Sequence, residues 1–333
     1  MIPEKLLNSV KENPFLLAPM AGITDAAFRS FMRELGCGVV VTELVSATGL
    51  KFSSEKTRKL MEFDESQHPV GIQIFGEDLD SLDYAARVVE QMGADFVDLN
   101  FGCPVPKVVK RGAGAALLRD LKALQQVLRV VKSAVSIPVT IKVRTGWDEA
   151  SRNAEQVAQV AADEGITWMA IHGRTRAQGY SGQADWDYIG RVVQESPIPI
   201  IGNGDLTSAT KAQQALSKSG CLGVMIGRGC LKNPWIFRQA MGKDQEKDFK
   251  LLLERLFYHL ERRYEDRLVF LQVKKFAAWY SAGYPDSARF RRQLFELKDK
   301  DQLKAEVFEF FALMQRLPQT DTSHEPFLMG GHG

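Results

Sequence analysis

One cysteine at the end of a predicted strand is the first candidate for chemistry in this chain. Cys103 follows the predicted strand 96–100 and stands in a Gly-Cys-Pro turn, which would direct its side chain away from the core. A free thiol has an unperturbed pKa of about 8.5, so it stays mostly protonated near neutral pH. Cys103 is therefore a candidate proton donor. An isolated cysteine beside a turn would more often pack as a small hydrophobic residue, so the surrounding motifs must decide.

Polar side chains also mark the ends of other predicted strands. Lys142 lies in the otherwise apolar run 139–143, where a buried ammonium group is costly unless it meets an anion or an electron-rich ligand. The Gln73 amide could bind the edge of a heterocycle or a neighbouring strand. His172 and Arg174 follow another apolar run. The ends of parallel strands meet at one edge, so these residues indicate an active site, although Lys142 could also be an exposed charge.

Two glycine-containing turns follow the last two predicted strands. They are Asn203-Gly204-Asp205 and Gly227-Arg228. In a barrel, turns at these two places commonly bind phosphate through backbone N–H groups, and glycine lets the backbone approach the oxygens closely. Two ordinary tight turns are the alternative. The sequence has no Gly-Lys-Ser/Thr run, which would be typical of a nucleoside triphosphatase.

Short apolar, β-branched runs alternate with amphipathic segments along the first two thirds of the chain. This pattern is typical of repeated βα units around a parallel sheet. We predict an α/β protein with a (β/α)8 TIM barrel and a C-terminal helical domain. An open doubly wound sheet is disfavoured because no Gly-x-Gly-x-x-Gly turn follows the first strand. The predicted strands are 15–18, 39–42, 70–74, 96–100, 139–143, 168–172, 198–202 and 223–226, and the clearest helices are 25–35, 81–92, 121–134, 153–164 and 208–218.

The alternating pattern ends after Pro234. We predict a barrel over residues 1–245, a helical domain over 246–317 and a flexible tail over 318–333. In the helical domain, basic residues that include Arg291 and Arg292 lie among aromatic ones, as on a surface that binds phosphates and exposed bases. Acidic residues nearly balance the basic ones there, so a solvated helical bundle is the alternative.

The composition is that of an ordinary globular protein, with 333 residues, of which 45% are hydrophobic and 25% charged, and a formal net charge of +2. The four cysteines form no Cys-x-x-Cys pair and have no histidine at zinc-ligand spacing, so we expect neither a disulfide framework nor a metal site. Residues 1–13 lack the apolar core of a signal peptide, and no long uncharged apolar stretch follows. We therefore expect a cytoplasmic protein that is neither exported nor membrane-spanning. We also expect a monomer.

With these motifs in order, the chain resembles the tRNA-dihydrouridine synthases, and most of all their bacterial B-type branch. The resemblance covers nearly the whole chain. Its motifs are Ala18-Pro19-Met20-Ala21-Gly22-Ile23-Thr24-Asp25, Gln73-Ile74-Phe75-Gly76, Asn100-Phe101-Gly102-Cys103-Pro104, Lys142-Val143-Arg144-Thr145-Gly146-Trp147, Ile171-His172-Gly173-Arg174-Thr175-Arg176, Asn203-Gly204-Asp205 and Ile226-Gly227-Arg228.

The resemblance implies that FMN binds at the barrel mouth. The flavin ring would lie against the first motif, its pyrimidine edge would meet Gln73 and Lys142, and its phosphate would lie at the two glycine turns. His172 would contact the flavin or its ribityl phosphate; a histidine that only caps its strand is the alternative. The residues assigned to the cofactor are Pro19, Met20, Ala21, Gln73, Lys142, His172, Asn203, Gly204, Asp205, Gly227 and Arg228.

The resemblance also implies the reaction, which is reduction of uridine to 5,6-dihydrouridine in the D loop of tRNA with NADPH. A hydride would pass from flavin N5 to uracil C6, and Cys103 would protonate C5. Because the mouth is narrow, the base must leave its stack, and tRNA contacts must offset the cost. Asn100, Arg174, Arg291 and Arg292 are the substrate contacts we expect. Which uridine is reduced stays open.

Two other functions remain possible from the sequence. One is an FMN-dependent barrel oxidoreductase acting on a free small molecule, such as a dihydroorotate-type pyrimidine. The other is a flavin-containing RNA-binding protein without turnover. The basic and aromatic helical domain argues against the first, and Cys103, which binding alone would not require, argues against the second.

Overall fold

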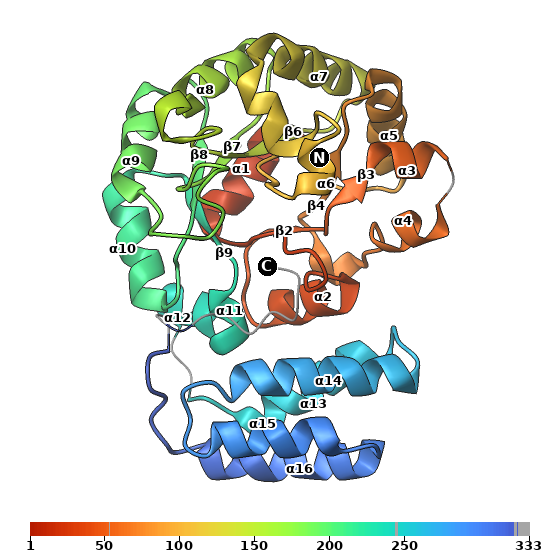
Figure 1. Ribbon diagram of the computed structural model, residues 1–333, viewed down its shortest axis with the longest axis vertical. Helices are drawn as coiled ribbons and strands as arrows, with labels where there is room; N and C mark the ends of the chain where they lie inside the picture. The colour runs from red at the N-terminus through yellow and green to blue at the C-terminus, as the bar shows by residue number, and fades with distance from the viewer. Residues whose placement is uncertain (53, 244–245, 323–324, 326–333) are drawn as a thin grey trace.

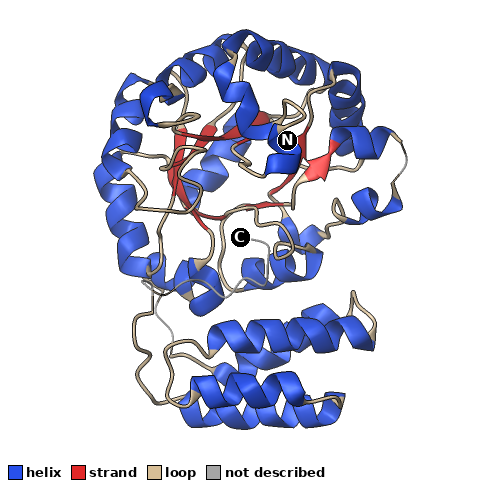
Figure 2. Ribbon diagram, in the orientation of Figure 1, coloured by secondary structure: helices blue, strands red, loops and turns tan. Residues whose placement is uncertain are grey.

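Parallel strands form the centre of the molecule. The computed structural model describes residues 1–52, 54–243, 246–322 and 325. In Figure 2 the strands lie inside a ring of helices. The strands are β1 (Phe15–Leu17), β2 (Val40–Val41), β3 (Val45–Ser46), β4 (Val70–Phe75), β5 (Phe96–Phe101), β6 (Val139–Arg144), β7 (Met169–His172), β8 (Ile200–Asn203) and β9 (Gly223–Ile226).

The sheet closes on itself. Its strand order is β1-β9-β8-β7-β6-β5-β4-β2, and every pairing is parallel. The backbone N–H of Leu17 donates to the carbonyl of Val39 (2.9 Å), and that of Gly38 donates to Phe15 (2.9 Å), which joins β1 to the segment that leads into β2. The predicted (β/α)8 barrel is confirmed. The short strand β3, which extends the pairing with β4, was not predicted.

Helices surround the barrel and continue below it (Figure 1). The α-helices are α1 (Pro3–Glu12), α2 (Ala26–Glu34), α3 (Ala47–Lys51), α4 (Glu55–Lys59), α5 (Leu79–Gln91), α6 (Pro106–Val109), α7 (Leu121–Ala134), α8 (Ala154–Asp163), α9 (Trp186–Glu195), α10 (Ala209–Ser219), α11 (Gly229–Lys232), α12 (Ile236–Ala240), α13 (Phe249–Glu261), α14 (Asp266–Tyr280), α15 (Ser287–Glu296) and α16 (Lys300–Met314). Short 3-10 turns are η1 (Glu65–Gln67), η2 (Gly114–Arg119) and η3 (Glu149–Ser151).

Local sequence signals explain where the helices begin and end. The carboxylate of Asp25 accepts a hydrogen bond from Phe28 N (2.9 Å) at the start of α2, and Asp120 does the same for α7. Helix α10 ends at Gly220, whose φ of 71° suits glycine. These signals give the helices that follow β1, β4, β5, β6 and β8. Helix α9, with a capping Asp185, was missed.

The helical domain packs against the barrel through α13 and α14, and α15 and α16 pack on these two helices. The rings of Phe28 on α2 and Phe276 on α14 are stacked with centroids 5.1 Å apart. Glu34 on α2 accepts two hydrogen bonds from Arg255 (2.6 and 2.8 Å), and His259 Nε2 lies 2.8 Å from it. One hydrophobic cluster contains residues of β1, α2 and all four of these helices. The core therefore crosses the proposed boundary between residues 245 and 246.

The segment after α16 is held at its start. Gln319 donates to the carbonyl oxygens of Lys232 (3.1 Å) and Ala282 (2.8 Å), and Thr320 N donates to Gly283 (2.8 Å). Lys232 Nζ donates to the carbonyl of Thr322 (2.6 Å). The expectation of a flexible tail over 318–333 therefore does not describe residues 319–322. Residues 323–324 and 326–333 lie outside the described residues.

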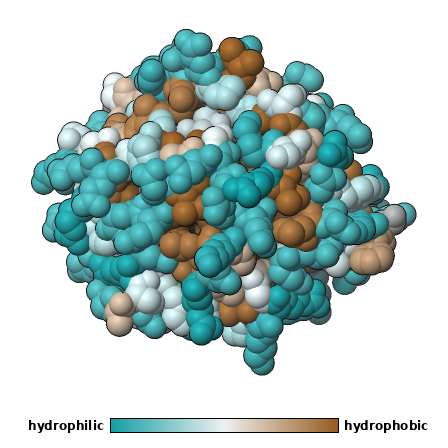
Figure 3. All heavy atoms as spheres, turned by 90° about the horizontal axis from the view of Figure 1, so that it is seen from above, coloured by the Kyte–Doolittle hydropathy of each residue, from teal (hydrophilic) through white to brown (hydrophobic). Residues whose placement is uncertain are grey.

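The outer surface mixes hydrophilic and hydrophobic side chains. Seen from the side of α7 and α8, hydrophilic residues predominate and hydrophobic ones form separate patches between them (Figure 3). Within the described ranges, no helix has the length and apolar character needed to cross a membrane. The described residues also contain no group of three or more His, Cys, Asp or Glu that could hold a metal ion.

Candidate active site

A large cavity opens at the carboxyl ends of the strands and has a volume of about 2440 Å³. All the residues that the sequence assigned to cofactor or catalysis line it, and so do two of the four assigned to substrate. They are Pro19, Met20, Ala21, Gln73, Asn100, Cys103, Lys142, His172, Arg174, Asn203, Gly204, Asp205, Gly227 and Arg228. The other two, Arg291 and Arg292, lie on α15.

Cys103 lies in a turn that Asn100 builds. The side-chain oxygen of Asn100 accepts hydrogen bonds from the backbone N–H of Gly102 (3.1 Å) and of Cys103 (2.8 Å). The thiol is half-buried. Burial raises its pKa, and this outweighs the opposing effects of the backbone at Val105 and of the cations Arg144 and Lys142. Cys103 is therefore a protonated thiol near neutral pH, as a proton donor must be.

A chain of buried hydrogen bonds connects this turn to the neighbouring strands. Asn100 Nδ2 donates to Gln73 Oε1 (2.8 Å), Gln73 Nε2 donates to Asp98 Oδ2 (2.6 Å), and Thr140 Oγ1 donates to Asp98 Oδ1 (2.6 Å). These residues come from β4, β5 and β6. The chain fixes the amides of Gln73 and Asn100, and each amide keeps one N–H that these bonds do not use.

Lys142 brings a largely buried ammonium group to the cavity. Among the described residues its one hydrogen bond goes to Asn203 Oδ1 (3.2 Å), a neutral partner. Burial is the main cause that lowers the pKa of Lys142 to about 8, Arg144 adds to the shift, and Asp98 and Cys103 oppose it. A buried cation whose hydrogen-bond partner is neutral fits an anionic or electron-rich ligand, such as the pyrimidine edge of a flavin.

Arg174 and Asp205 pair with each other. Two nitrogens of the guanidinium donate to the two carboxylate oxygens, each at 2.8 Å, and Arg174 also donates to the carbonyls of Ser181 (3.1 Å) and Gly182 (2.7 Å). Only 3% of Arg174 is exposed. These bonds hold Arg174 against the loop after β7, and its contact with substrate stays a prediction. With its carboxylate occupied, Asp205 would meet a phosphate through its backbone.

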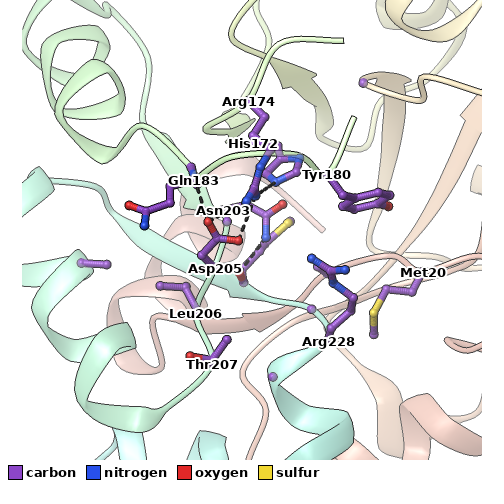
Figure 4. A pocket seen from close by; sticks show the side chains of 18 of the residues that line it. Met20, His172, Arg174, Tyr180, Gln183, Asn203, Asp205, Leu206, Thr207 and Arg228 are labelled. Carbon is purple, nitrogen blue, oxygen red and sulfur yellow. Dashed lines mark hydrogen bonds and ion pairs between the residues drawn. The ribbon is translucent and has the colours of Figure 1, made fainter. Parts of the chain in front are cut away.

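Arg228 and Tyr180 form the other side of the cavity (Figure 4). The guanidinium carbon of Arg228 lies 4.7 Å from the centre of the Tyr180 ring. Tyr180 is 50% exposed, and the Arg144 guanidinium also lies over its ring, at 5.7 Å. Gly204, at φ 134°, follows Asn203, and a Cβ there would lie 2.5 Å from Ala184. The backbone, Arg228 and the glycine turns together suit a phosphate.

His172 is buried beside these cations. Burial is the main cause that lowers its pKa well below the ordinary value, and Arg144, Lys142, Arg174 and Arg228 add to the shift. The imidazole is therefore neutral near pH 7. It can bind a ligand by hydrogen bonding, and it adds no positive charge to the site.

Sequence reasoning gave no role to Arg144 or Tyr180. Arg144 donates to the carbonyls of Gly102 (2.9 Å), Thr175 (2.9 Å) and Gly179 (2.7 Å), so it connects the Cys103 turn to the loop that carries Tyr180. A signal existed for Arg144, because residues two apart on a strand point to the same face and Lys142 was already assigned. No comparable signal marks Tyr180, which lies in a loop.

The two predicted tRNA contacts on α15, Arg291 and Arg292, differ in how far they are exposed. Arg291 is partly buried, and it lies close enough to Lys232 of α11 to contribute to the lowered pKa of that lysine, behind the larger effect of burial. Arg292 is exposed. Lys232 lines the cavity, so Arg291 faces the junction between barrel and helices.

Known proteins resemble this chain over most of its length. A tRNA-dihydrouridine synthase B from Pseudomonas syringae pv. tomato is 38% identical over 94% of this chain and 96% of its own length. A probable tRNA-dihydrouridine synthase from Rickettsia prowazekii is 37% identical over 92% of this chain and 97% of its own.

A solved structure shares the fold alone. The 6-hydroxypseudooxynicotine amine oxidase of Pseudomonas geniculata N1 has a TM-score of 0.54 and 16% identity, over 69% of this chain and 47% of that one. Residues 16–315 match the family model described as dihydrouridine synthase (Dus). With this match and relatives well above 30% identity, the chain belongs to the dihydrouridine synthase family.

Proposed function

We propose that this protein reduces uridine to 5,6-dihydrouridine in tRNA, with FMN bound at the barrel mouth and NADPH as reductant. The observation that carries the proposal is the protonated Cys103 thiol, held by Asn100 at a cavity that also contains the buried Lys142 ammonium. The relatives at 38% and 37% identity are named for this reaction. A binding protein without turnover would need no positioned acid.

The residues of the mouth fit FMN. We place the ring against Pro19, Met20 and Ala21, with the pyrimidine edge at Lys142. The phosphate would bind at the backbone of residues 203–205 and at Arg228. When bound and reduced by NADPH, FMN would supply the hydride for C6 of uracil. Lys142, charged below its pKa of about 8, would stabilise negative charge on the reduced cofactor.

Cys103 would complete the reaction by giving its proton to C5. Hydride at C6 and a proton at C5 together saturate the C5–C6 double bond. The thiolate that remains would recover a proton from solvent. Arg144 and Lys142 would stabilise the thiolate for that interval, because both lower the pKa of Cys103.

Basic side chains on α15 and on the barrel rim would hold the tRNA. Arg291 and Arg292 are two of them. On the barrel rim, Lys107, Lys110 and Arg111 are exposed directly after Cys103, and no acidic residue stands between Asp98 and Asp120. We place the enzyme in the cytoplasm with its tRNA, as a monomer.

A single-turnover experiment tests the proposal. Protein is loaded with FMN, reduced, and mixed without oxygen with a tRNA transcript that lacks dihydrouridine. We expect flavin reoxidation and dihydrouridine detected by nucleoside mass spectrometry. Free uridine and orotate serve as the small-molecule alternatives. If orotate reoxidises the flavin and tRNA does not, the enzyme acts on a free pyrimidine.

A further inference from the structure

The loop that joins β1 to α2 forms part of the cavity wall. Residues 18–22 line the cavity, and three of them are proposed flavin contacts. Thr24 holds the base of the loop, because its hydroxyl accepts from Met20 N (2.9 Å) and donates to Met20 O (3.1 Å). Beyond Met20 the loop reaches Gly22, which is exposed and has a φ of 71°. Glycine adopts this angle readily but does not by itself fix the loop.

Gly22 lies between two different parts of the molecule. On one side is the carboxyl group of Glu43, which follows β2 and belongs to the barrel, and the Gly22 backbone lowers the pKa of that carboxyl. Its carbonyl accepts a hydrogen bond from Lys275 Nζ on α14. Gly22 thus lies beside a barrel carboxyl group and accepts a hydrogen bond from the helical domain. The position of the loop depends on where α14 lies.

Lys275 lies among charged groups of both signs, which include Glu43, Asp25 and Arg29. Glu43 is buried, and burial is the main cause that raises its pKa, with Asp25 adding to the shift and Arg29 and Lys275 opposing it. Burial lowers the pKa of Lys275, and Asp25 and Glu43 oppose that shift. Without the Lys275 ammonium, two carboxylates beside the loop would lose a partner.

The neighbouring residue, Lys274, points to a different part of the molecule. Lys274 Nζ donates to the carbonyls of Leu297 (2.5 Å) and Phe295 (3.3 Å), both in the helical domain. Two adjacent lysines on one helix therefore make different connections, one within the helical domain and one to the cavity loop. This difference separates a general effect on the helical domain from a specific effect on the loop.

We propose that Lys275 is a positioning residue for the flavin-facing loop, so that α14 of the helical domain sets the geometry of the cofactor site. The inference rests on the proposed function, because it requires FMN at the barrel mouth. It assigns the helical domain a second role besides contact with tRNA. Lys275 touches neither the proposed ring contacts nor the phosphate turns, and it acts through Gly22.

Flavin binding in the absence of tRNA tests this role. FMN is titrated into flavin-free protein, and quenching of its fluorescence gives the dissociation constant for wild type, Lys275→Met, Lys275→Arg and Lys274→Met. We expect Lys275→Met to raise the dissociation constant about tenfold and to shift the visible circular dichroism of bound flavin. Lys275→Arg keeps the charge and the donors and should restore both. Lys274→Met should stay within about twofold of wild type even if its melting temperature falls.

Each possible result either supports or overturns the proposed role of Lys275. Equal dissociation constants for wild type and Lys275→Met would overturn the inference, as would an equal rise in Lys274→Met, which would show a general loss of helical-domain stability. Should Lys275→Met not fold, Lys275→Gln replaces it with the same expected rise. If wild type itself binds no flavin, the proposed function fails first, and the two failures are thereby distinguished.

Discussion

The barrel mouth and helix α15 both carry cations, but they hold them in different ways. Lys142, Arg144 and Arg174 are largely buried, and each donates to fixed partners inside the protein. On α15, Arg291 is partly buried and Arg292 is exposed. Fixed, desolvated charges suit a reaction, because they need no rearrangement as charge develops. Exposed charges suit a polyanion, which they bind in a salt-dependent way.

Replacing the proton donor should have the largest effect and isolate chemistry within the mouth. Cys103→Ala should lose about 10²–10⁴-fold in dihydrouridine formation while FMN binding and NADPH oxidation persist, because neither needs a proton at C5. Rapid mixing of the reduced variant with tRNA measures the loss. A loss below about threefold, with only reduced stability, would make Cys103 a packing residue.

Removing the buried ammonium should come next. Lys142→Met should slow turnover on the order of 10²-fold and make the reduction potential of bound flavin more negative, because negative charge on the reduced cofactor loses its counterion. The potential is measured by dye equilibration. An unchanged potential and rate would remove Lys142 from its proposed role and weaken the contrast between fixed and exposed cations.

Charge reversal on α15 should affect binding without affecting the cofactor. Arg291→Glu combined with Arg292→Glu should weaken tRNA binding about tenfold and reduce the slope of log affinity against log salt by about 2, because fewer counterions are released. Flavin content should stay normal. Arg292→Glu alone is the sharper variant, since Arg291 faces Lys232. If a folded double variant keeps its salt slope, α15 is merely solvated surface.

The smallest expected effect is a pH dependence of FMN affinity. The pKa of Lys142 is lowered to about 8, so the side chain is charged below that pH and neutral above it. A charged Lys142 should bind the electron-rich pyrimidine edge of the flavin more strongly than a neutral one, so FMN affinity should fall a few-fold as pH rises above about 8. Calorimetric titrations at several pH values measure this. The control is Lys142→Met, in which this fall should be absent; a fall that persists there belongs to another group.

Much of the fold follows from local patterns, while the connections within the site do not. The β-branched runs and capping residues predict the barrel, since they act over a few residues each. The chain from Asn100 through Gln73 to Asp98 depends on the register of β4 against β5, which no local pattern fixes. The pairing of Arg174 with Asp205 likewise joins the loops that follow two neighbouring strands, β7 and β8. For that reason the sequence predicted which residues line the cavity but not the hydrogen bonds that connect them.

The stacking of Phe28 on Phe276 has a consequence for how the protein is made. The two rings are about 250 residues apart in the chain, so the face of α2 that carries Phe28 leaves the ribosome long before α14 exists. At ordinary rates of synthesis the delay is roughly 12 to 50 s. For most of that time β1 also lacks β9, its partner in the closed sheet. Nascent chains stalled before residue 266 should therefore remain sensitive to protease, and full-length chains should not.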